Sequence, residues 1–241
     1  MLVLIKIMWL KAPNIDCKHG FSTRWGGISK EPYNNLNLGG QEEDAEIIKE
    51  NRRLALQHLN LSIDNLCYLK QVHGNRVRRA KIGQLEGDAL VTNTPNLVLA
   101  ISVADCYPIL FYDEVNRVIG AAHAGWRGTV SKIAENTINK MLELGANVNT
   151  IKVAIGQGIC QDRFEVGNEV IDEFEKNSFP NYCWKDNKID LIACNTFVLN
   201  ENNISKENIW VMNRCTFEDD FFSYRQDKGK TGRMWAVIAL P

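Results

Sequence analysis

The sequence lacks both a strong charge imbalance and a long apolar run. Lys and Arg number 28 against 29 Asp and Glu, a formal net charge of −1, so we expect no broad basic surface for nucleic acid. The apolar start of the chain is too short to span a bilayer, carries Lys6, and is followed by no small-residue cleavage site. We therefore expect a cytoplasmic protein whose partners include neither a membrane nor a nucleic acid.

Histidine is scarce, and the cysteines show no pairing pattern. The chain has four His and seven Cys, an odd number with no C-x-x-C pair, which argues against a secreted disulfide framework and favours a reducing compartment. Several common signatures are also missing: a G-x-S-x-G elbow, an H-E-x-x-H helix, and a complete phosphate or dinucleotide loop. Function must therefore be sought in single residues at the ends of predicted elements.

The hydrophobic pattern predicts one mixed α and β domain over residues 1–241. Short apolar runs predict strands at 2–10, 66–72, 97–103, 108–112, 117–122, 151–155, 208–213 and 233–240. Periodic stretches predict helices at 43–59, 130–142, 166–177 and 190–201, whereas 19–37 is rich in turn signals. Residues 97–103 alternate larger with smaller side chains, as a half-buried strand does. We expect an α+β fold in which helices flank mixed sheet layers.

Three side chains that bind metals lie at the ends of predicted strands. His73 follows one apolar run, Cys106 follows the next, and His123 ends a third, before the Gly-rich turn Gly125–Gly128. Two imidazoles and a thiolate form an incomplete tetrahedron, and zinc held this way lowers the pKa of bound water from about 15.7 towards about 7. Copper also accepts such ligands.

Three other interpretations of these residues stay open. Cys106 and His123 would also form a metal-free nucleophilic dyad. Buried His and free Cys are often ordinary core residues. A closed, structural zinc site would need a fourth ligand, for which Cys17, Cys67 and Cys160 are the candidates.

Five charged residues are candidates for catalysis or anion binding. Asp88 and Asp105 would act as acid or base, or orient a ligating histidine. Arg24, Arg127 and Arg225 lie beside glycine, aromatic or hydroxyl residues, which suits the recognition of phosphate. A helix N-terminus near residues 128–129, beside Arg127, would strengthen the hold on an anion.

A set of short motifs spans nearly the whole chain, from about His19 to Leu240. The motifs are His-Gly-Phe-Ser-Thr-Arg-x-Gly-Gly at 19–27, Leu-Asn-Leu-Gly at 36–39, Gln-Val-His-Gly at 71–74, Gly-Asp-Ala-Leu-Val-Thr at 87–92, Ala-Asp-Cys-x-Pro-Ile-Leu at 104–110, His-Ala-Gly-Trp-Arg-Gly-Thr at 123–129, Phe-Glu-Val-Gly at 164–167, Phe-Phe-Ser-Tyr-Arg at 221–225 and Thr-Gly-Arg-Met at 231–234. Together they resemble the YfiH-like family, also called the laccase-domain or polyphenol-oxidase family.

The resemblance implies an α/β/β/α-type layered fold and zinc at His73, Cys106 and His123. It also implies a purine nucleoside phosphorylase for adenosine, inosine, guanosine and methylthioadenosine, with adenosine deaminase activity, so purine nucleoside and phosphate are the expected partners. Two alternatives come with the family: a copper-dependent polyphenol oxidase, and a Cys or zinc hydrolase that edits peptidoglycan precursors. The chain departs from the family at 156–166, where two prolines and a cysteine are missing, so substrate preference is the expectation most affected.

Overall fold

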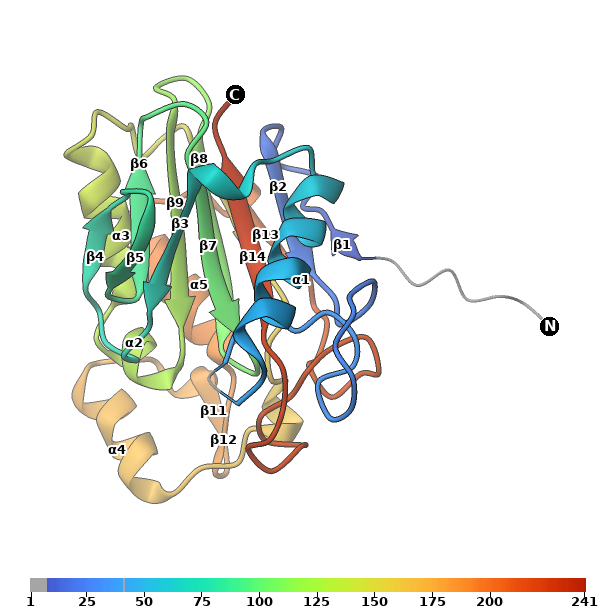
Figure 1. Ribbon diagram of the computed structural model, residues 1–241. Helices are drawn as coiled ribbons and strands as arrows, with labels where there is room; N and C mark the ends of the chain where they lie inside the picture. Colours follow the sequence, from blue (N-terminus) through green and yellow to red (C-terminus); the bar gives the residue numbers. More distant parts are fainter. Residues whose placement is uncertain (1–7, 41) are drawn as a thin grey trace.

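Short strands and helices follow one another along residues 8–40 and 42–241, which this computed structural model describes (Figure 1). The strands are β1 (Trp9–Leu10), β2 (Lys18–Ser22), β3 (Leu66–Lys70), β4 (Val77–Arg79), β5 (Gly83–Glu86), β6 (Ala89–Thr92), β7 (Val98–Val103), β8 (Tyr107–Asp113), β9 (Val118–Ala124), β10 (Ile151–Ile155), β11 (Trp184–Lys185), β12 (Lys188–Ile189), β13 (Ile209–Val211) and β14 (Met234–Ala239). The α-helices are α1 (Ala45–His58), α2 (Trp126–Val130), α3 (Ile133–Leu142), α4 (Asn168–Lys176) and α5 (Leu191–Glu201). None of these helices is long and apolar enough to cross a membrane.

The strands form two six-stranded sheets and a small two-stranded ribbon of β11 and β12. The first sheet has the order β1-β2-β14-β7-β3-β5, and the second has the order β13-β10-β8-β9-β6-β4. β3 runs parallel to β7, and β14 runs antiparallel to both β2 and β7. The C-terminal ends of β3, β7 and β9 therefore lie at the same end of the molecule, where α2 begins (Figure 1).

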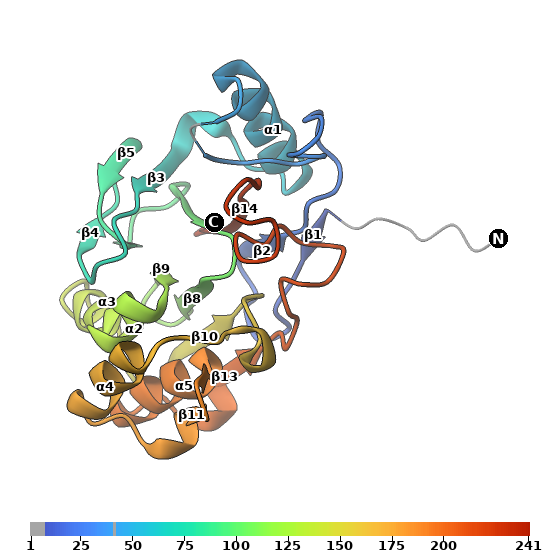
Figure 2. The same cartoon turned by 90° about the horizontal axis from the view of Figure 1, so that it is seen from below.

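The two sheets pack face to face, and helices cover both outer faces (Figure 2). Apolar side chains between the sheets include Phe21, Leu99, Ile101, Leu110, Ile119, Ala236 and Ile238. A second cluster lies under α1, and a third lies between the second sheet and α3, α4 and α5. The result is a four-layer α/β/β/α arrangement, which confirms the predicted fold class.

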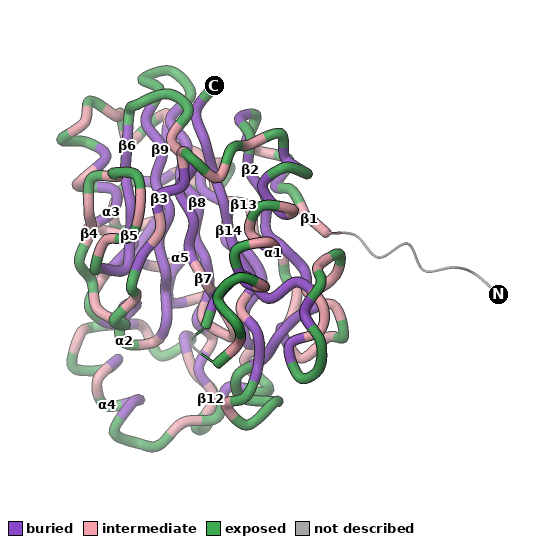
Figure 3. The backbone as a smooth tube through the Cα atoms, in the orientation of Figure 1, coloured by how far each residue is buried: buried purple, intermediate pink, exposed green. Residues whose placement is uncertain are grey.

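Alternate residues of the central strands point into different apolar clusters. In β7, Leu99 and Ile101 face the second sheet, whereas Val98 and Ala100 face α1. Because both faces are covered, these strands are buried along nearly their whole length (Figure 3). The prediction that 97–103 is a half-buried strand is therefore wrong: its smaller residues pack beneath a helix.

Three predicted elements differ from the structure. The helix expected over 130–142 is interrupted at Lys132, whose φ of 62° is left-handed, so α2 and α3 are separate helices. The turn-rich segment 19–37 begins inside a strand, β2. Of the strand expected at 2–10, the last two residues form β1, and positions 2–7 lie outside the described residues.

Candidate metal centre

His73, Cys106 and His123 lie together at the end of the sheets where β3, β7 and β9 finish. Their ligand atoms all lie within 4.8 Å of one another, and the group contains only these three among the described residues. The two imidazole rings meet edge to face, with centroids 4.8 Å apart. His123 is buried, Cys106 is half-buried and His73 is exposed, so the group opens towards solvent on the His73 side. A thiolate and two imidazoles at this spacing fit zinc with a remaining open position.

Gln71 ties the loop that carries His73 to the strand that leads to Cys106. Its side-chain Nε2 donates to the carbonyl oxygen of Ser102, and its Oε1 accepts from the Ser102 N–H, both at 2.8 Å. The side-chain amide of Gln71 thus takes the place of a peptide group and pairs with the backbone of β7, beyond the last backbone pair of β3 and β7. This role of Gln71 is not predicted from the sequence, although a polar amide directly after an apolar strand is a signal for it.

Asp88 lies behind the two histidines and is fully buried. One carboxylate oxygen, Oδ1, accepts from His123 Nδ1 at 3.0 Å and from the His73 N–H at 2.9 Å; the other, Oδ2, accepts from Gly74 N–H at 2.8 Å. Burial opposes the charged form, but the hydrogen bonds from His123 and the backbone outweigh it and hold the pKa of Asp88 below its usual range. This contact leaves Nε2 of His123 as its ligand atom, as a carboxylate behind a ligating histidine does.

Two glycines after His123 leave no room for side chains. A Cβ on Gly125 would lie 2.8 Å from Cys106 Sγ, and a Cβ on Gly128 would lie 3.0 Å from the carbonyl oxygen of Gly74. This turn therefore brings backbone close to the three candidate ligands. A helix begins beside the site, two residues earlier than expected: α2 starts at Trp126, so Gly128 and Thr129 lie inside it.

The charges around Cys106 favour its thiolate. Desolvation would raise the pKa of this thiol, but the charge of His123 and the hydrogen bonds from His123 and His73 lower it from 9.0 to about 6. Burial would likewise lower the pKa of His123, yet Cys106 and Asp88 raise it to about 9. Between these values the metal-free site holds a thiolate beside an imidazolium. The candidate sulfur ligand is thus already deprotonated near neutral pH.

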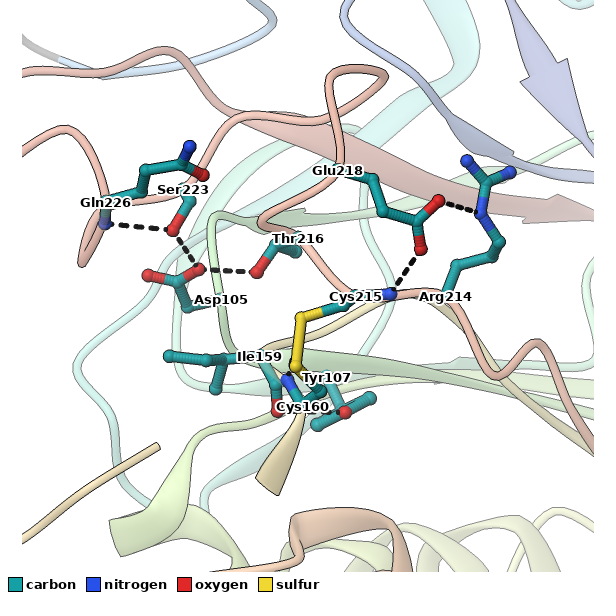
Figure 4. Close-up of a disulfide and its surroundings, with 10 residues drawn as sticks. All are labelled: Asp105, Tyr107, Ile159, Cys160, Arg214, Cys215, Thr216, Glu218, Ser223 and Gln226. Carbon is teal, nitrogen blue, oxygen red and sulfur yellow. Dashed lines mark hydrogen bonds and ion pairs between the residues drawn. A yellow bond between two sulfur atoms is a disulfide. The ribbon is translucent and has the colours of Figure 1, made fainter. Parts of the chain in front are cut away.

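Asp105 does not contact a histidine; its carboxylate binds a separate loop. Oδ1 accepts from the hydroxyls of Thr216 at 2.6 Å and Ser223 at 2.7 Å, as Figure 4 shows, and Oδ2 accepts from the Arg225 N–H at 2.7 Å. Asp105 itself has a left-handed φ of 87°. Its contacts join the residue before Cys106 to the segment 213–227. Thr216 and Ser223 were not identified from the sequence.

The three candidate arginines have different surroundings. The guanidinium of Arg24 donates to the backbone oxygens of Asn34 and Phe221. That of Arg225 donates to the backbone oxygen of Glu165. Arg127 is exposed, and its guanidinium stacks on the Trp126 ring, 4.2 Å from the ring centroid. The Arg127 side chain makes no hydrogen bond or ion pair with the described residues.

The cysteines proposed as a fourth ligand are occupied elsewhere. Cys17 and Cys67 are buried in the cluster between the sheets. Cys160 forms a disulfide with Cys215, across 55 positions of sequence. The structure therefore places none of the three with the candidate ligands. The odd cysteine count and irregular spacing did not reveal this pair.

Comparison with known proteins places this arrangement in a family. Residues 18–241 match the family model described as multi-copper polyphenol oxidoreductase laccase. A purine nucleoside phosphorylase of Deinococcus radiodurans is 44% identical over 96% of this chain and 92% of its own length. Adenosine deaminase RL5, from an unknown prokaryotic organism, is 34% identical over 94% of this chain and 95% of its own. The crystal structure of YlmD from Geobacillus stearothermophilus superposes with a TM-score of 0.92 at 31% identity, covering 97% of this chain and 96% of that one. The chain belongs to the YfiH-like, laccase-domain family.

Proposed function

We propose that the chain is a zinc-dependent purine nucleoside phosphorylase that also deaminates adenosine. The observation that carries the proposal is the 44% identity, over 96% of the chain, to a protein named purine nucleoside phosphorylase. The deaminase part is supported by the relative named adenosine deaminase, and zinc by the cluster of His73, Cys106 and His123. The substrates are then a purine nucleoside with phosphate or with water.

In this proposal His73, Cys106 and His123 hold the ion, and the chain supplies the rest of the site. Bound zinc would supply a Lewis acid for a substrate oxygen or for water. Asp88 keeps His123 in the orientation that presents Nε2, and it fixes the His73–Gly74 turn through backbone hydrogen bonds. The prediction that Asp88 or Asp105 moves a proton stays a prediction; the contacts of both suit positioning, because each carboxylate is already held by several donors.

Phosphate needs a cation that is not already engaged. Arg127 meets this condition best, because its guanidinium makes no hydrogen bond or ion pair to the described residues. In the sequence, Arg127 also follows Gly125 by two positions, and Gly125 abuts Cys106. The planar guanidinium binds phosphate oxygens in a bidentate manner. Arg24 and Arg225 would first have to release backbone oxygens. We therefore propose Arg127, in preference to Arg24 and Arg225, as the residue that binds phosphate.

A multicopper oxidase is less well supported by the chain's own residues. The sequence has four His in all. His19 is engaged elsewhere, since its Nε2 accepts from the Ala12 N–H at 2.9 Å, and His58 lies in α1. Two imidazoles remain at the site, far fewer than a multicopper cluster consumes. A single copper ion bound by the same three ligands is the form of the oxidase alternative that the geometry accommodates.

The test is turnover by protein of known metal content. Zinc-loaded protein incubated with adenosine and phosphate should give adenine and ribose 1-phosphate, and adenosine with water alone should give inosine and ammonia. His123→Ala should lose zinc and both reactions together, and Arg127→Ala should raise the KM for phosphate while leaving deamination intact. A zinc-loaded protein that leaves adenosine unchanged contradicts the proposal, and activity in metal-free protein would favour the Cys106–His123 dyad.

A further inference from the structure

The Cys160–Cys215 disulfide joins two segments that both bind Asp105. Ile159, next to Cys160, donates its N–H to the Asp105 carbonyl oxygen at 2.8 Å. Thr216, next to Cys215, donates its hydroxyl to Asp105 Oδ1 at 2.6 Å. Asp105 is in turn the residue before Cys106. The disulfide therefore closes a ring of contacts around the position that carries the candidate thiolate ligand (Figure 4).

The backbone of Asp105 lies in a sparsely populated region. Its φ of 87° is left-handed, a conformation that is uncommon for residues other than glycine, although aspartate adopts it more readily than most. The two segments that carry these contacts are far apart in sequence. They meet through the disulfide, through backbone hydrogen bonds such as that from Thr216 N–H to the Gly158 carbonyl oxygen at 2.9 Å, and through the pairing of β10 with β13 just before them. Loss of the covalent link would leave Asp105 held by hydrogen bonds alone, from Ile159, Thr216, Ser223 and the Arg225 N–H.

The disulfide also borders a cavity. Cys160 and Cys215 are both half-buried and line a cavity of about 330 Å³ together with Tyr107, Arg214 and Glu218. This volume lies within the range of small-molecule sites and admits a small dithiol. The other cysteines of the described chain are unpaired. Disulfides that a reductant can reach are the labile ones, whereas structural disulfides resist reduction.

We propose that Cys160 and Cys215 form a redox-sensitive clamp that holds the Asp105–Cys106 turn in its metal-binding form. A thiolate of a dithiol attacks one of the two sulfurs, the S–S bond breaks, and the other cysteine leaves as a thiolate. The second thiol of the reductant then displaces the first cysteine. Two electrons and two protons pass to the protein, which ends with two thiols, and the reductant ends as a cyclic disulfide. This inference rests on the proposed role of Cys106 as a metal ligand.

The experiment compares the wild type with Cys160→Ser/Cys215→Ser, which is permanently open. Hydrogen–deuterium exchange of residues 103–107 is measured in metal-free protein before and after dithiothreitol. Exchange should rise on reduction in the wild type, and it should be high and insensitive to dithiothreitol in the double variant. Zinc affinity, measured against a chelating dye without reductant, should fall about tenfold in the double variant, the usual scale for loss of support behind a ligand.

Cys67→Ser is the matched control, because Cys67 is a buried free cysteine in the core between the sheets. It should behave as the wild type in both measurements. Exchange in β14 should stay unchanged in every sample, which would show that the fold is intact. If the double variant does not fold, the comparison of the wild type with and without dithiothreitol still tests the clamp. Alkylation of the cysteines shows whether dithiothreitol has opened the disulfide. If the disulfide is open and exchange at residues 103–107 is unchanged, the clamp is refuted. A protein that binds no zinc contradicts the proposed function, and the exchange result still decides the clamp.

Discussion

The two sides of the candidate metal centre are built in different ways. On the histidine side, the side chain of His123 projects from a central strand of a sheet, and a fully buried carboxylate, Asp88, binds both its ring and the backbone of the His73 turn. On the cysteine side, Cys106 lies between β7 and β8 and Asp105 beside it binds hydroxyls of a long loop. One side is fixed by the sheet, and the other is held by loops.

The difference suggests a division of labour between the two carboxylates. Asp88 acts directly on a candidate ligand, since it hydrogen-bonds the ring that would face the metal. Asp105 acts on the backbone around a candidate ligand and touches neither imidazole. The geometry of the histidine side should therefore be insensitive to substitutions in the loops, whereas the geometry of the cysteine side should change with them.

The largest expected effect comes from exchanging each carboxylate for its amide. Asp88→Asn should lower zinc affinity 10- to 100-fold, because His123 loses its charged partner and the new amide NH2 faces the Gly74 N–H. It should also destabilise the metal-free protein by about 3 kcal/mol, because an uncompensated buried group remains. Asp105→Asn keeps an oxygen for the hydroxyls and should have a clearly smaller effect on both. Chelator competition and thermal unfolding measure the two quantities; an equal loss in both variants would refute the division of labour.

The second prediction concerns the pH at which Cys106 becomes a thiolate. Because its pKa is lowered to about 6, the thiolate should be present above that pH and lost below it. At about pH 7.5 the metal-free protein should thus show thiolate absorbance in the ultraviolet that an ordinary cysteine would lack. The signal should be absent in Cys106→Ala, and its midpoint should rise in Asp88→Asn, where His123 is a weaker cation. A midpoint near 9 in the wild type would contradict the ion pair.

Much of the fold and the three candidate ligands were predictable from local patterns. Strands such as β8 and β10 appear as apolar runs, and the candidate ligands stand near the ends of such runs, within two positions of a glycine or proline. The pattern failed where tertiary contacts decide. Buried strands under α1 look half-exposed, because small residues such as Ala100 pack against a helix. A single left-handed residue, Lys132, divides a continuous apolar stripe into two helices.

The supporting residues were harder to predict because their partners are distant in sequence. Thr216 and Ser223 reach Asp105 across more than a hundred positions, and the Cys160–Cys215 pair crosses 55. No spacing rule connects such residues. The altered loop 156–166 was expected to affect substrate preference; Cys160 and two neighbours in it line the cavity beside the disulfide, and the effect on substrates stays a prediction.

The smallest expected effect tests how firmly the two sides are joined, and Gln71 is the residue to change. Its amide satisfies both backbone groups of Ser102, so Gln71→Ala leaves a donor and an acceptor without that partner and should cost about 1–2 kcal/mol in stability. Gln71→Glu offers a second matched change, because it keeps the acceptor for the Ser102 N–H but replaces the donor to its carbonyl. Zinc affinity should fall only a few-fold in either variant, since Asp88 still fixes the His73 turn. Denaturant unfolding and chelator competition measure these values. A loss of zinc affinity as large as that of Asp88→Asn would show that the pairing of β3 with β7, rather than the buried carboxylate, sets the distance between the histidine and cysteine sides.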